Sequence, residues 1–302
     1  MTTAAGSTAY VEAVIDVGDE AAEALTNFLW EQGAVGVVEE ALPAGPARLR
    51  AFFPVSAGID ALAVRIDAYV AGLRALGLAA GPHARVTSLA DADWAAAWRE
   101  HFRPVAVGKR LLIAPPWETP AAGDRLVLTI EPGRAFGTGH HGTTAGCLEL
   151  LESIVAVEQP ARALDLGTGS GILAIAAARL GVASVLACDS DPDAIAAAAS
   201  NAALNGVADH VHASIADVAT LAAEPAPLVL ANLLAAAHRV FAARYATLVG
   251  AGGILVAGGL LDAEADDVAR ALAVHGFRRE AARNLEGWTS LALRHAPLHA
   301  SA

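Results

Sequence analysis

The sequence predicts an α/β fold with a mainly parallel sheet in its carboxyl-terminal part, preceded by a small α+β domain. Three observations predict it. From Arg125 onward, apolar strands alternate with helical segments, which is typical of a parallel sheet covered by helices on both faces. Residues 1–90 instead follow the order β-α-β-β-α-β. Residues 91–118 follow neither pattern, so we expect domains at 1–90 and 119–302, joined by a linker helix and an extended segment.

Alternation and turn residues predict four strands and two helices in residues 1–90. This order of elements is that of a ferredoxin-like split βαβ unit. No residue here resembles a catalytic group, so we expect a binding or scaffolding module. The expected strands are 11–17, 36–41, 48–54 and 84–89; the helix at 19–31 carries Leu25, Phe28 and Leu29 on one face, and a second helix carries Leu62, Ile66, Tyr69, Leu73 and Leu76 and ends at Gly77.

The connecting segment begins with DADWAAAWREHF at 91–102, which predicts a helix with Trp94, Trp98 and Phe102 on one face. An aromatic stripe of this kind usually packs against other elements, and a substrate contact is the alternative. Residues 103–117 predict extended and loop structure.

The carboxyl-terminal part predicts apolar strands followed by an antiparallel hairpin with its turn at Glu286-Gly287. This is a seven-stranded, Rossmann-like layout, in which ligands bind beyond the carboxyl ends of the parallel strands. The expected parallel strands are 126–130, 163–166, 184–188, 228–231 and 254–257, and the hairpin strands begin at 277 and run over 288–293.

Charge and composition restrict the function classes. The chain has a formal charge of −12 and no basic stripe beyond the pair Lys109-Arg110, so it lacks the electrostatic footprint of a nucleic-acid binder. An acidic surface suits a basic partner, or simply keeps the protein soluble. Apolar runs are interrupted before the ~20 residues of a membrane span. Because Cys147 and Cys188 are too few for a disulfide framework and no signal peptide is evident, we expect a cytoplasmic protein without a membrane partner.

The segment ALDLGTGSGILAIA at 163–176 is the strongest functional motif. A strand ends near Asp165, and Gly167, Gly169 and Gly171 follow before a helix, where backbone must turn sharply and a ligand must approach closely. A nicotinamide-binding turn needs its third Gly or Ala five residues after the first, and that position is Ile172. The acidic residue before the turn also suits a cofactor that carries an ammonium group. The motif therefore favours a methyl-donor site over a dinucleotide site.

Two more polar residues end apolar strands at the same predicted edge. Asp189 can accept hydrogen bonds from both ribose hydroxyls, whereas Asp191, before Pro192, is the better helix N-cap. Asn232 ends the strand LVLAN and would face the same crevice, where its amide can accept from an incoming amine. A helix N-cap is the alternative for Asn232, and this residue alone does not decide between the two.

The loop EPGRAFGTGHHGTT at 131–144 contains four glycines and precedes a helix. Thr143 or Thr144 can cap that helix or contact a ligand. His140 and His141 invite a metal site, yet no other ligand stands at a suitable spacing, so we expect no metal and a solvent-exposed or substrate-lining role.

Five segments resemble the PrmA family, bacterial methyltransferases that modify ribosomal protein L11 of the large subunit. The glycine-rich turn is shared by many methyltransferases, whereas AFGTG-H-TT and ANLLA are particular to this family. The loop departs from the usual family pattern at His140 and Gly142, where Thr and Pro are usual. The segments are 91–118, 131–144, LDLGTGSGILAIAA at 164–177, CDSDPDAI at 188–195 with Asn205-Gly206, and LVLANLLA at 228–235.

The resemblance implies an S-adenosylmethionine methyltransferase domain and an amino-terminal domain that recognises the substrate, ribosomal protein L11. The implied reaction is methylation of lysine ε-amines and of an α-amine. We predict that Asn232 and backbone carbonyls orient the amine while the proton leaves through water. By position, Thr144, Gly167, Asp189 and Asn232 match the family's cofactor contacts, and the complete predicted cofactor site is Thr144, Asp165, Gly167, Gly169, Gly171, Asp189 and Asn232.

Two other functions remain open at this stage. A nucleic-acid amino-methyltransferase would carry a similar asparagine, but usually followed by two prolines and an aromatic residue, where this chain has Leu233-Leu234-Ala235. A non-catalytic binding protein with a vestigial cofactor fold is the second alternative. The intact Gly167, Asp189 and Asn232 argue against it.

Overall fold

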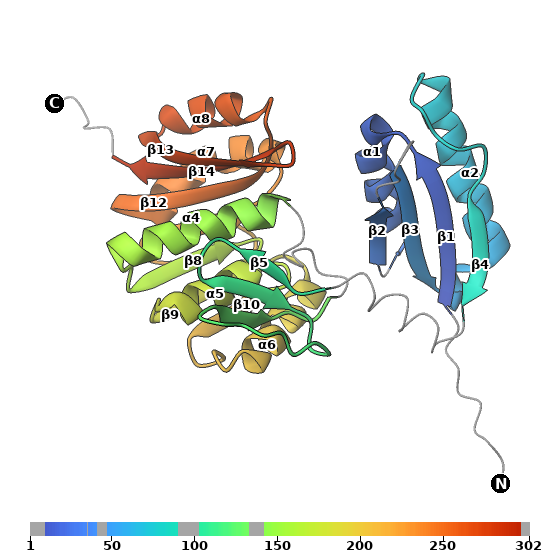
Figure 1. Cartoon of the computed structure of the whole chain (residues 1–302). Helices are drawn as coiled ribbons and strands as arrows, with labels where there is room; N and C mark the ends of the chain where they lie inside the picture. The colour runs from blue at the N-terminus through green and yellow to red at the C-terminus, as the bar shows by residue number, and fades with distance from the viewer. Residues whose placement is uncertain (1–9, 35, 41–46, 90–102, 133–141, 297–302) are drawn as a thin grey trace, which may run out of the picture. The chain divides into compact units, whose positions relative to one another are not determined.

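The computed structural model of the chain describes residues 10–34, 36–40, 47–89, 103–132 and 142–296. The chain divides into two compact units, residues 1–102 and 103–302 (Figure 1). The helix expected at 91–102, with its tryptophan stripe, lies outside the described residues. Within the described ranges, no helix is both long and apolar enough to cross a membrane.

The first unit contains an antiparallel sheet with the strand order β2-β3-β1-β4 and two helices. Alternate residues of β1 are buried because one face of the strand packs on the helices; Ile15, Leu25 and Ile66 are fully buried in this core. Phe28 of the first helix stacks on Tyr69 of the second, with ring centroids 4.0 Å apart. The elements are β1 (Tyr10–Val17), α1 (Asp19–Glu31), β2 (Gly36–Glu40), β3 (Ala47–Pro54), the 3₁₀ turn η1 (Val55–Ala57), α2 (Ile59–Ala75) and β4 (Arg85–Leu89).

The apolar stripe expected on the second helix is wrong at its last member. Helix α2 ends at Ala75, and Leu76 lies beyond it with 79% of its surface exposed. Gly77 follows with a φ of +84°, so the chain turns away in the left-handed region that glycine adopts without strain. Val70 is buried within the helix instead.

The second unit is built on a seven-stranded sheet with the order β10-β9-β8-β11-β12-β14-β13. Strands β10, β9, β8, β11 and β12 are parallel, and β14 is antiparallel to both of its neighbours. The hairpin turn is as expected, because Glu286 and Gly287 both have positive φ, of 53° and 82°. The elements are α4 (Gly142–Glu158), β8 (Arg162–Leu166), α5 (Ile172–Leu180), β9 (Ser184–Asp189), α6 (Pro192–Leu204), β10 (Val211–Ile215), β11 (Ala226–Asn232), α7 (Ala235–Leu248), β12 (Val249–Leu261), α8 (Ala265–Ala273), β13 (Phe277–Leu285) and β14 (Trp288–His295).

One expected strand of this sheet is wrong. Residues 126–130 do form a strand, β7 (Leu126–Thr129), but it pairs with β6 (Leu111–Ala114) in a separate sheet of order β5-β6-β7, in which β5 is Val105–Val107. The edge position in the main sheet belongs to β10, which the sequence analysis does not assign. Its sequence, VHASI, is largely exposed, so it lacks the apolar run that marks the central strands.

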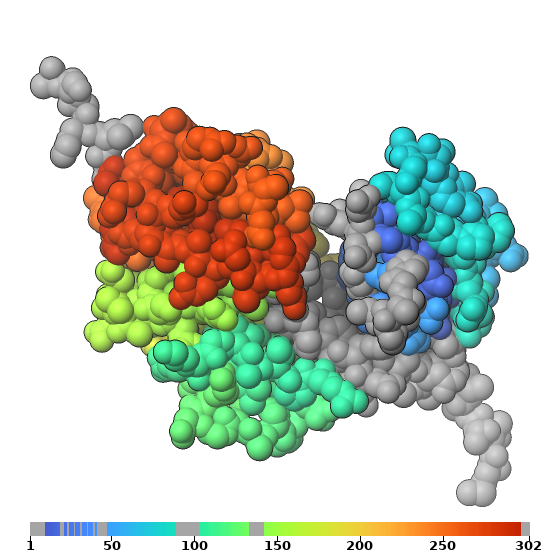
Figure 2. All heavy atoms as spheres, turned by 45° about the horizontal axis from the view of Figure 1, so that its top comes forward, coloured from blue at the N-terminus to red at the C-terminus, as the bar shows by residue number. Residues whose placement is uncertain are grey.

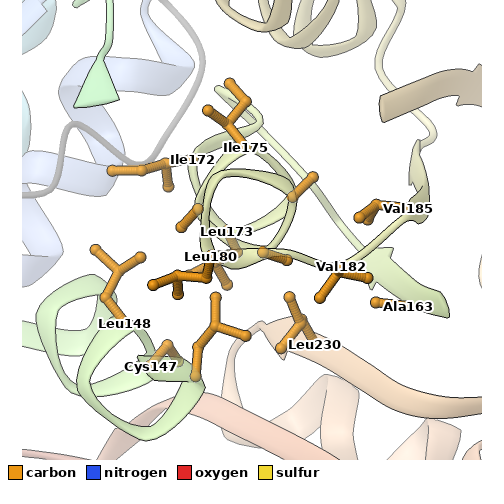
Figure 3. Packing of buried hydrophobic residues seen from close by; sticks show 14 of the residues in the cluster. Cys147, Leu148, Ala163, Ile172, Leu173, Ile175, Leu180, Val182, Val185 and Leu230 are labelled. Carbon is orange, nitrogen blue, oxygen red and sulfur yellow. The ribbon is translucent and has the colours of Figure 1, made fainter. Parts of the chain in front are cut away.

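The main core lies between one face of this sheet and helices α4 and α5. Ile172, Leu173 and Leu180 of α5 belong to the same buried cluster as Leu148 of α4 and Leu230 of β11 (Figure 3). On the other face, α7 and α8 cover a second apolar cluster. Figure 2 shows the last elements of the chain, in orange and red, packed beside α4 in yellow-green. The carboxyl ends of β8, β9 and β11, which are neighbours in the sheet, therefore share one edge.

Candidate functional site

The glycine-rich turn joins β8 to α5 at this edge. Gly167, Gly169 and Gly171 have φ values of +70°, +54° and +83°, a region that residues with a Cβ rarely adopt. A Cβ on Gly167 would lie 2.5 Å from the Leu233 side chain, and a Cβ on Gly171 would lie 3.0 Å from Ala198. Both the backbone conformation and the close neighbours therefore require glycine at Gly167 and Gly171. The turn is held by hydrogen bonds from the Gly167 and Thr168 amides to the Cys188 carbonyl.

Asp165 is buried beneath this turn. Its Oδ2 accepts hydrogen bonds from the Thr168 hydroxyl at 2.6 Å and from the Ala174 amide at 3.1 Å, so the carboxylate joins the turn to the first residues of α5. Burial raises the pKa of this carboxyl from 3.8 to about 6, although the two hydrogen bonds act in the opposite direction. These contacts give Asp165 a structural role, and the contact with a cofactor ammonium group stays a prediction.

Asp189 ends β9 beside the turn and is half-buried. One carboxylate oxygen accepts from the Gly169 amide at 3.1 Å, and the other accepts from the Asp191 amide at 3.1 Å. The N-cap of α6 is Asp191, which accepts from the Asp193 amide, with Pro192 at the first helical position. The expected role of Asp191 as the N-cap of α6 is therefore confirmed. The expected contact between Asp189 and the ribose stays a prediction.

Asn232 ends β11 and contacts the start of α4. Its Nδ2 donates to the hydroxyls of Thr143 and Thr144, at 3.3 and 3.4 Å, and both threonines are buried. Its Oδ1 is shielded from solvent and has no hydrogen-bond partner among the described residues. The N-cap of α7 is Leu234, without a side-chain cap, so Asn232 does not cap that helix. A shielded acceptor without a partner costs about 1–3 kcal/mol, which favours a ligand-binding role.

Sequence reasoning gave no structural role to two asparagines, Asn201 on α6 and Asn205 at its C-cap. Asn201 accepts from the Glu131 amide at 2.9 Å and donates to the Ser170 carbonyl at 2.9 Å, so it joins the start of the 131–144 loop to the glycine-rich turn. Asn205 lies four residues after Asn201. Its side chain accepts a hydrogen bond from the Thr129 amide and donates one to the Thr129 carbonyl. Their i, i+4 spacing within an alanine-rich helix is the signal that could have revealed them.

Most of the predicted site is thus brought together. Thr144, the three glycines, Asp189 and Asn232 lie on elements that meet at one edge of the sheet, whereas His140 and His141 lie outside the described residues. Within the described part of the chain, no cluster of three or more potential metal ligands is present.

Comparison with known proteins agrees with this architecture. A ribosomal protein L11 methyltransferase of Trichlorobacter lovleyi is 36% identical over 83% of this chain and 87% of the relative. One from Geobacillus kaustophilus is 34% identical over 93% and 97%. The crystal structure of a ribosomal protein L11 methylase from Lactobacillus delbrueckii subsp. bulgaricus has a TM-score of 0.59 and 30% identity, and covers 65% of this chain and 100% of its own. The model of the ribosomal protein L11 methyltransferase (PrmA) family matches residues 9–296, and the chain therefore belongs to that family.

Proposed function

We propose that this chain transfers methyl groups from S-adenosylmethionine to lysine ε-amines and the α-amine of ribosomal protein L11. The observation that carries the proposal is the shared edge of β9, β8 and β11. There the glycine-rich turn, the half-buried carboxylate of Asp189 and the Oδ1 of Asn232, which has no partner within the described ranges, meet. Membership of the family supports the same reaction.

The residues present fit the donor. Asp189 holds the Gly169 amide and still has acceptor capacity for ribose hydroxyls. Gly167, Gly169 and Gly171 let the main chain turn sharply between β8 and α5, beside Asp189. Thr144 and Asp165 complete the proposed cofactor site, the latter by holding the turn. When bound, S-adenosylmethionine supplies an electrophilic methyl group on a sulfonium.

Asn232 acts on the incoming amine. Its Oδ1 accepts an N–H of the amine and aims the nitrogen lone pair, while its Nδ2 is held by Thr143 and Thr144. Only a neutral amine can attack, and lysine, with a pKa of ~10.4, needs ~4–5 kcal/mol to lose its proton at pH 7. A desolvated site lowers that cost because burial disfavours the ammonium. The proton then leaves to water.

The remaining assignments concern the rest of the chain. We assign the amino-terminal unit the ferredoxin-like fold, supported by its βαββαβ order and the sheet order β2-β3-β1-β4, and the role of recognising ribosomal protein L11. The charge of −12 supports a basic protein partner and disfavours direct specificity for nucleic acid. A ribosomal substrate supports a cytoplasmic location.

The test is methylation of purified components. The full chain is incubated with methyl-labelled S-adenosylmethionine and either ribosomal protein L11 or ribosomal RNA, and the labelled product is mapped by mass. We expect label on lysine ε-amines and the α-amine of the protein, with a lysine rate that rises from pH 6 toward pH 10 as the neutral amine increases. Label on RNA alone, or donor binding without transfer to either, would overturn the proposal. A flat lysine profile with chemistry rate-limiting would overturn the base-free mechanism.

Recognition by the amino-terminal unit has its own test. A chain that starts at Arg103 retains every cofactor-site residue and the complete second unit. It should bind S-adenosylmethionine and fail to methylate ribosomal protein L11. Full methylation by this chain would place recognition in the second unit.

A further inference from the structure

A buried histidine and tyrosine lie on α7, directly behind the end of β11. His238 and Tyr245 are both fully buried. The His238 Nε2 is 2.8 Å from the Gly258 carbonyl oxygen, and the Tyr245 hydroxyl is 3.1 Å from His238 Nδ1. Because a carbonyl only accepts, Nε2 carries the hydrogen, and the tyrosine hydroxyl donates to Nδ1. The pair therefore fixes the neutral imidazole in one tautomer and one orientation.

Gly258 connects this pair to Asn232. The two residues are partners in the parallel register of β11 and β12, and a Cβ on Gly258 would lie 2.8 Å from Asn232 Oδ1. It would also overlap the Cys147 sulfur. The space beside the Asn232 amide exists because residue 258 is a glycine, and the position of the Gly258 backbone decides how much space there is.

Gly259 extends the same arrangement to the residue after Asn232. It has a φ of +78°, and a Cβ there would overlap the Leu233 carbonyl. The pairing of β12 with β14 shifts register between Ala257 and Leu260, so β12 bulges at this glycine pair. A bulge interrupts the regular interstrand hydrogen bonds that would otherwise hold its backbone. The hydrogen bond from His238 to the Gly258 carbonyl restrains the backbone at this point.

We propose that His238, fixed by Tyr245, is a positioning residue that acts through the Gly258 backbone to hold the Asn232 amide at the methyl-transfer site. The inference rests on the role proposed for Asn232. His238 touches neither substrate nor donor in this scheme. Its removal lets the bulge relax toward Asn232, and the amide loses the orientation that aims the amine.

The chain offers a matched control for a merely structural histidine. His295 is also buried, and its Nδ1 lies 2.8 Å from the Val249 carbonyl, at the opposite end of the same strand β12. Its ring stacks on Phe277, with centroids 4.8 Å apart. Loss of either ring removes a buried hydrogen bond to β12, but only loss of His238 affects the end beside Asn232.

The experiment compares His238→Leu, His238→Gln and His295→Leu in the full chain, with kcat, KM for ribosomal protein L11, donor affinity and thermal unfolding measured for each. We expect His238→Leu to lower kcat about 10-fold or more, with donor affinity changed less than about 2-fold, because misplacement of a positioning group acts mainly on the chemical step. His238→Gln should restore most of kcat, since its amide nitrogen can donate to the Gly258 carbonyl. The His295→Leu variant should be destabilised about as much as His238→Leu but should have the kcat of the wild type. If His238→Leu does not fold, Tyr245→Phe, which removes only the donor to Nδ1, should lower kcat without a change in donor affinity.

A double-mutant cycle with Asn232→Ala separates the two proposals. If His238 acts through Asn232, His238→Leu lowers kcat by less than about 2-fold in the Asn232→Ala background, because interacting residues are non-additive. Full activity of Asn232→Ala would overturn the role of Asn232 and, with it, this inference. An impaired Asn232→Ala combined with a fully active His238→Leu, or with additive losses in the double variant, would overturn the inference alone.

Discussion

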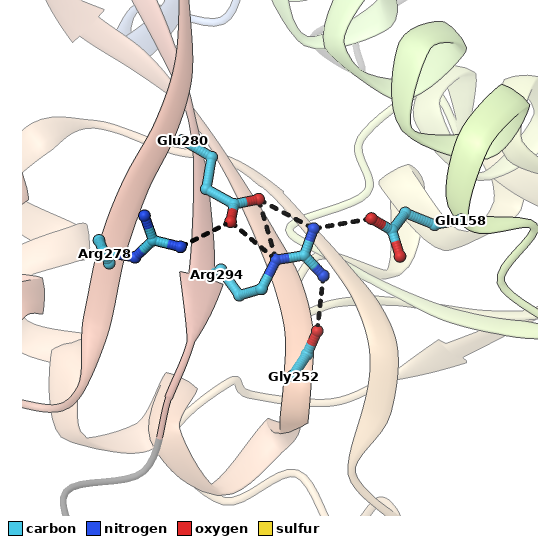
Figure 4. A network of polar contacts seen from close by, with 5 residues as sticks. All are labelled: Glu158, Gly252, Arg278, Glu280 and Arg294. Atoms are coloured by element: carbon cyan, nitrogen blue, oxygen red, sulfur yellow. Dashed lines mark hydrogen bonds and ion pairs between the residues drawn. The ribbon is translucent and has the colours of Figure 1, made fainter.

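The two ends of the seven-stranded sheet differ in how far the protein satisfies the hydrogen bonds of its own polar side chains. At the amino end of the parallel strands, Arg294 donates to both oxygens of Glu280 at 2.9 Å, to the Gly252 carbonyl at 2.9 Å and to Glu158 at 2.7 Å (Figure 4). Arg278 adds a 3.0 Å contact to Glu280. At the carboxyl end, by contrast, the shielded Oδ1 of Asn232 has no hydrogen-bond partner among the described residues.

This difference shows where the fold keeps hydrogen-bonding capacity in reserve. The Arg294 cluster uses its donors on the protein itself, which ties α4, β12 and β14 together. The partnerless acceptor at the other end lowers stability unless a ligand supplies the missing donor. Variants at the carboxyl end should therefore change activity more than stability, and variants at the amino end should do the reverse.

The largest effect is expected for Asn232→Ala. Loss of the amide removes the acceptor for the amine, and misplacement of a reacting group costs on the order of 10²-fold in rate. Stability should stay nearly the same, because removal of the unsatisfied Oδ1 relieves its burial cost and offsets the loss of the Nδ2 bonds, which are long at 3.3 and 3.4 Å. Single-turnover rates and urea unfolding measure the two quantities. Unfolding at much lower urea, with little change in rate, would make Asn232 a structural residue.

Asp189→Ala should weaken donor binding by about 1.5–3 kcal/mol, the range for hydrogen bonds to a charged group. Isothermal titration with S-adenosylmethionine measures it. Asp191→Ala is the matched control, because it removes the α6 cap two residues away, at a cost of about 1 kcal/mol of stability, without touching the turn. Equal donor affinity in the Asp189 variant and the wild type would contradict the ribose assignment.

Asp165 gives a pH-dependent prediction. Its folded-state pKa of about 6 lies above its ordinary 3.8 because of burial, so between these values the folded state holds a proton that the unfolded state has lost. This carboxyl therefore makes the protein less stable as pH rises through that window, by up to about 3 kcal/mol in total. Asp165→Asn lacks this dependence, so its stability relative to wild type should rise between pH 4 and 7.

Urea unfolding at several pH values tests this prediction. His238, whose pKa burial lowers to about 4, titrates over nearly the same range with the opposite sign. It is present in both proteins and cancels in the difference between them. Parallel stability curves for Asp165→Asn and wild type would show that the carboxyl is not perturbed by burial.

The local part of the site could be predicted from sequence. Gly167 follows the end of β8, Gly171 is the N-cap of α5 and Asp189 ends β9, so their roles in the backbone follow from neighbouring residues. Asn232 could be placed at the correct edge, but its position alone did not separate a cap from a ligand contact. Because Leu234 is the N-cap of α7 and no side chain caps it, the capping role is wrong, and the ligand contact stays a prediction.

What sequence could not provide depends on distant contacts. The hydrogen bond from His238 to the Gly258 carbonyl depends on how α7 packs on β12. A histidine in a helical segment of the sequence does not predict that packing. Likewise, the expected place of residues 126–130 in the main sheet was wrong because an apolar strand specifies burial but not its partner. Polar β10 occupies the edge, where an apolar pattern is not needed.

Small effects are expected at the opposite end of the sheet, where Arg294→Met is the variant to test. Neighbouring charges raise the pKa of Arg294 and lower that of Glu280, through their direct hydrogen bonds. The side chains keep 27% and 28% of their surface exposed, so solvent and salt screen the pairs and the stability loss should be about 1 kcal/mol. The loss of stability should shrink in high salt because salt screens the ion pairs. The kcat should stay within about 2-fold of wild type, because distant sites act independently.

The control is Arg278→Met, at a more exposed position where the arginine contacts Glu280. It should change stability by less than about 0.5 kcal/mol. A large fall in kcat for Arg294→Met would mean that the amino end of the sheet controls the site, and the separation between the two ends would not hold.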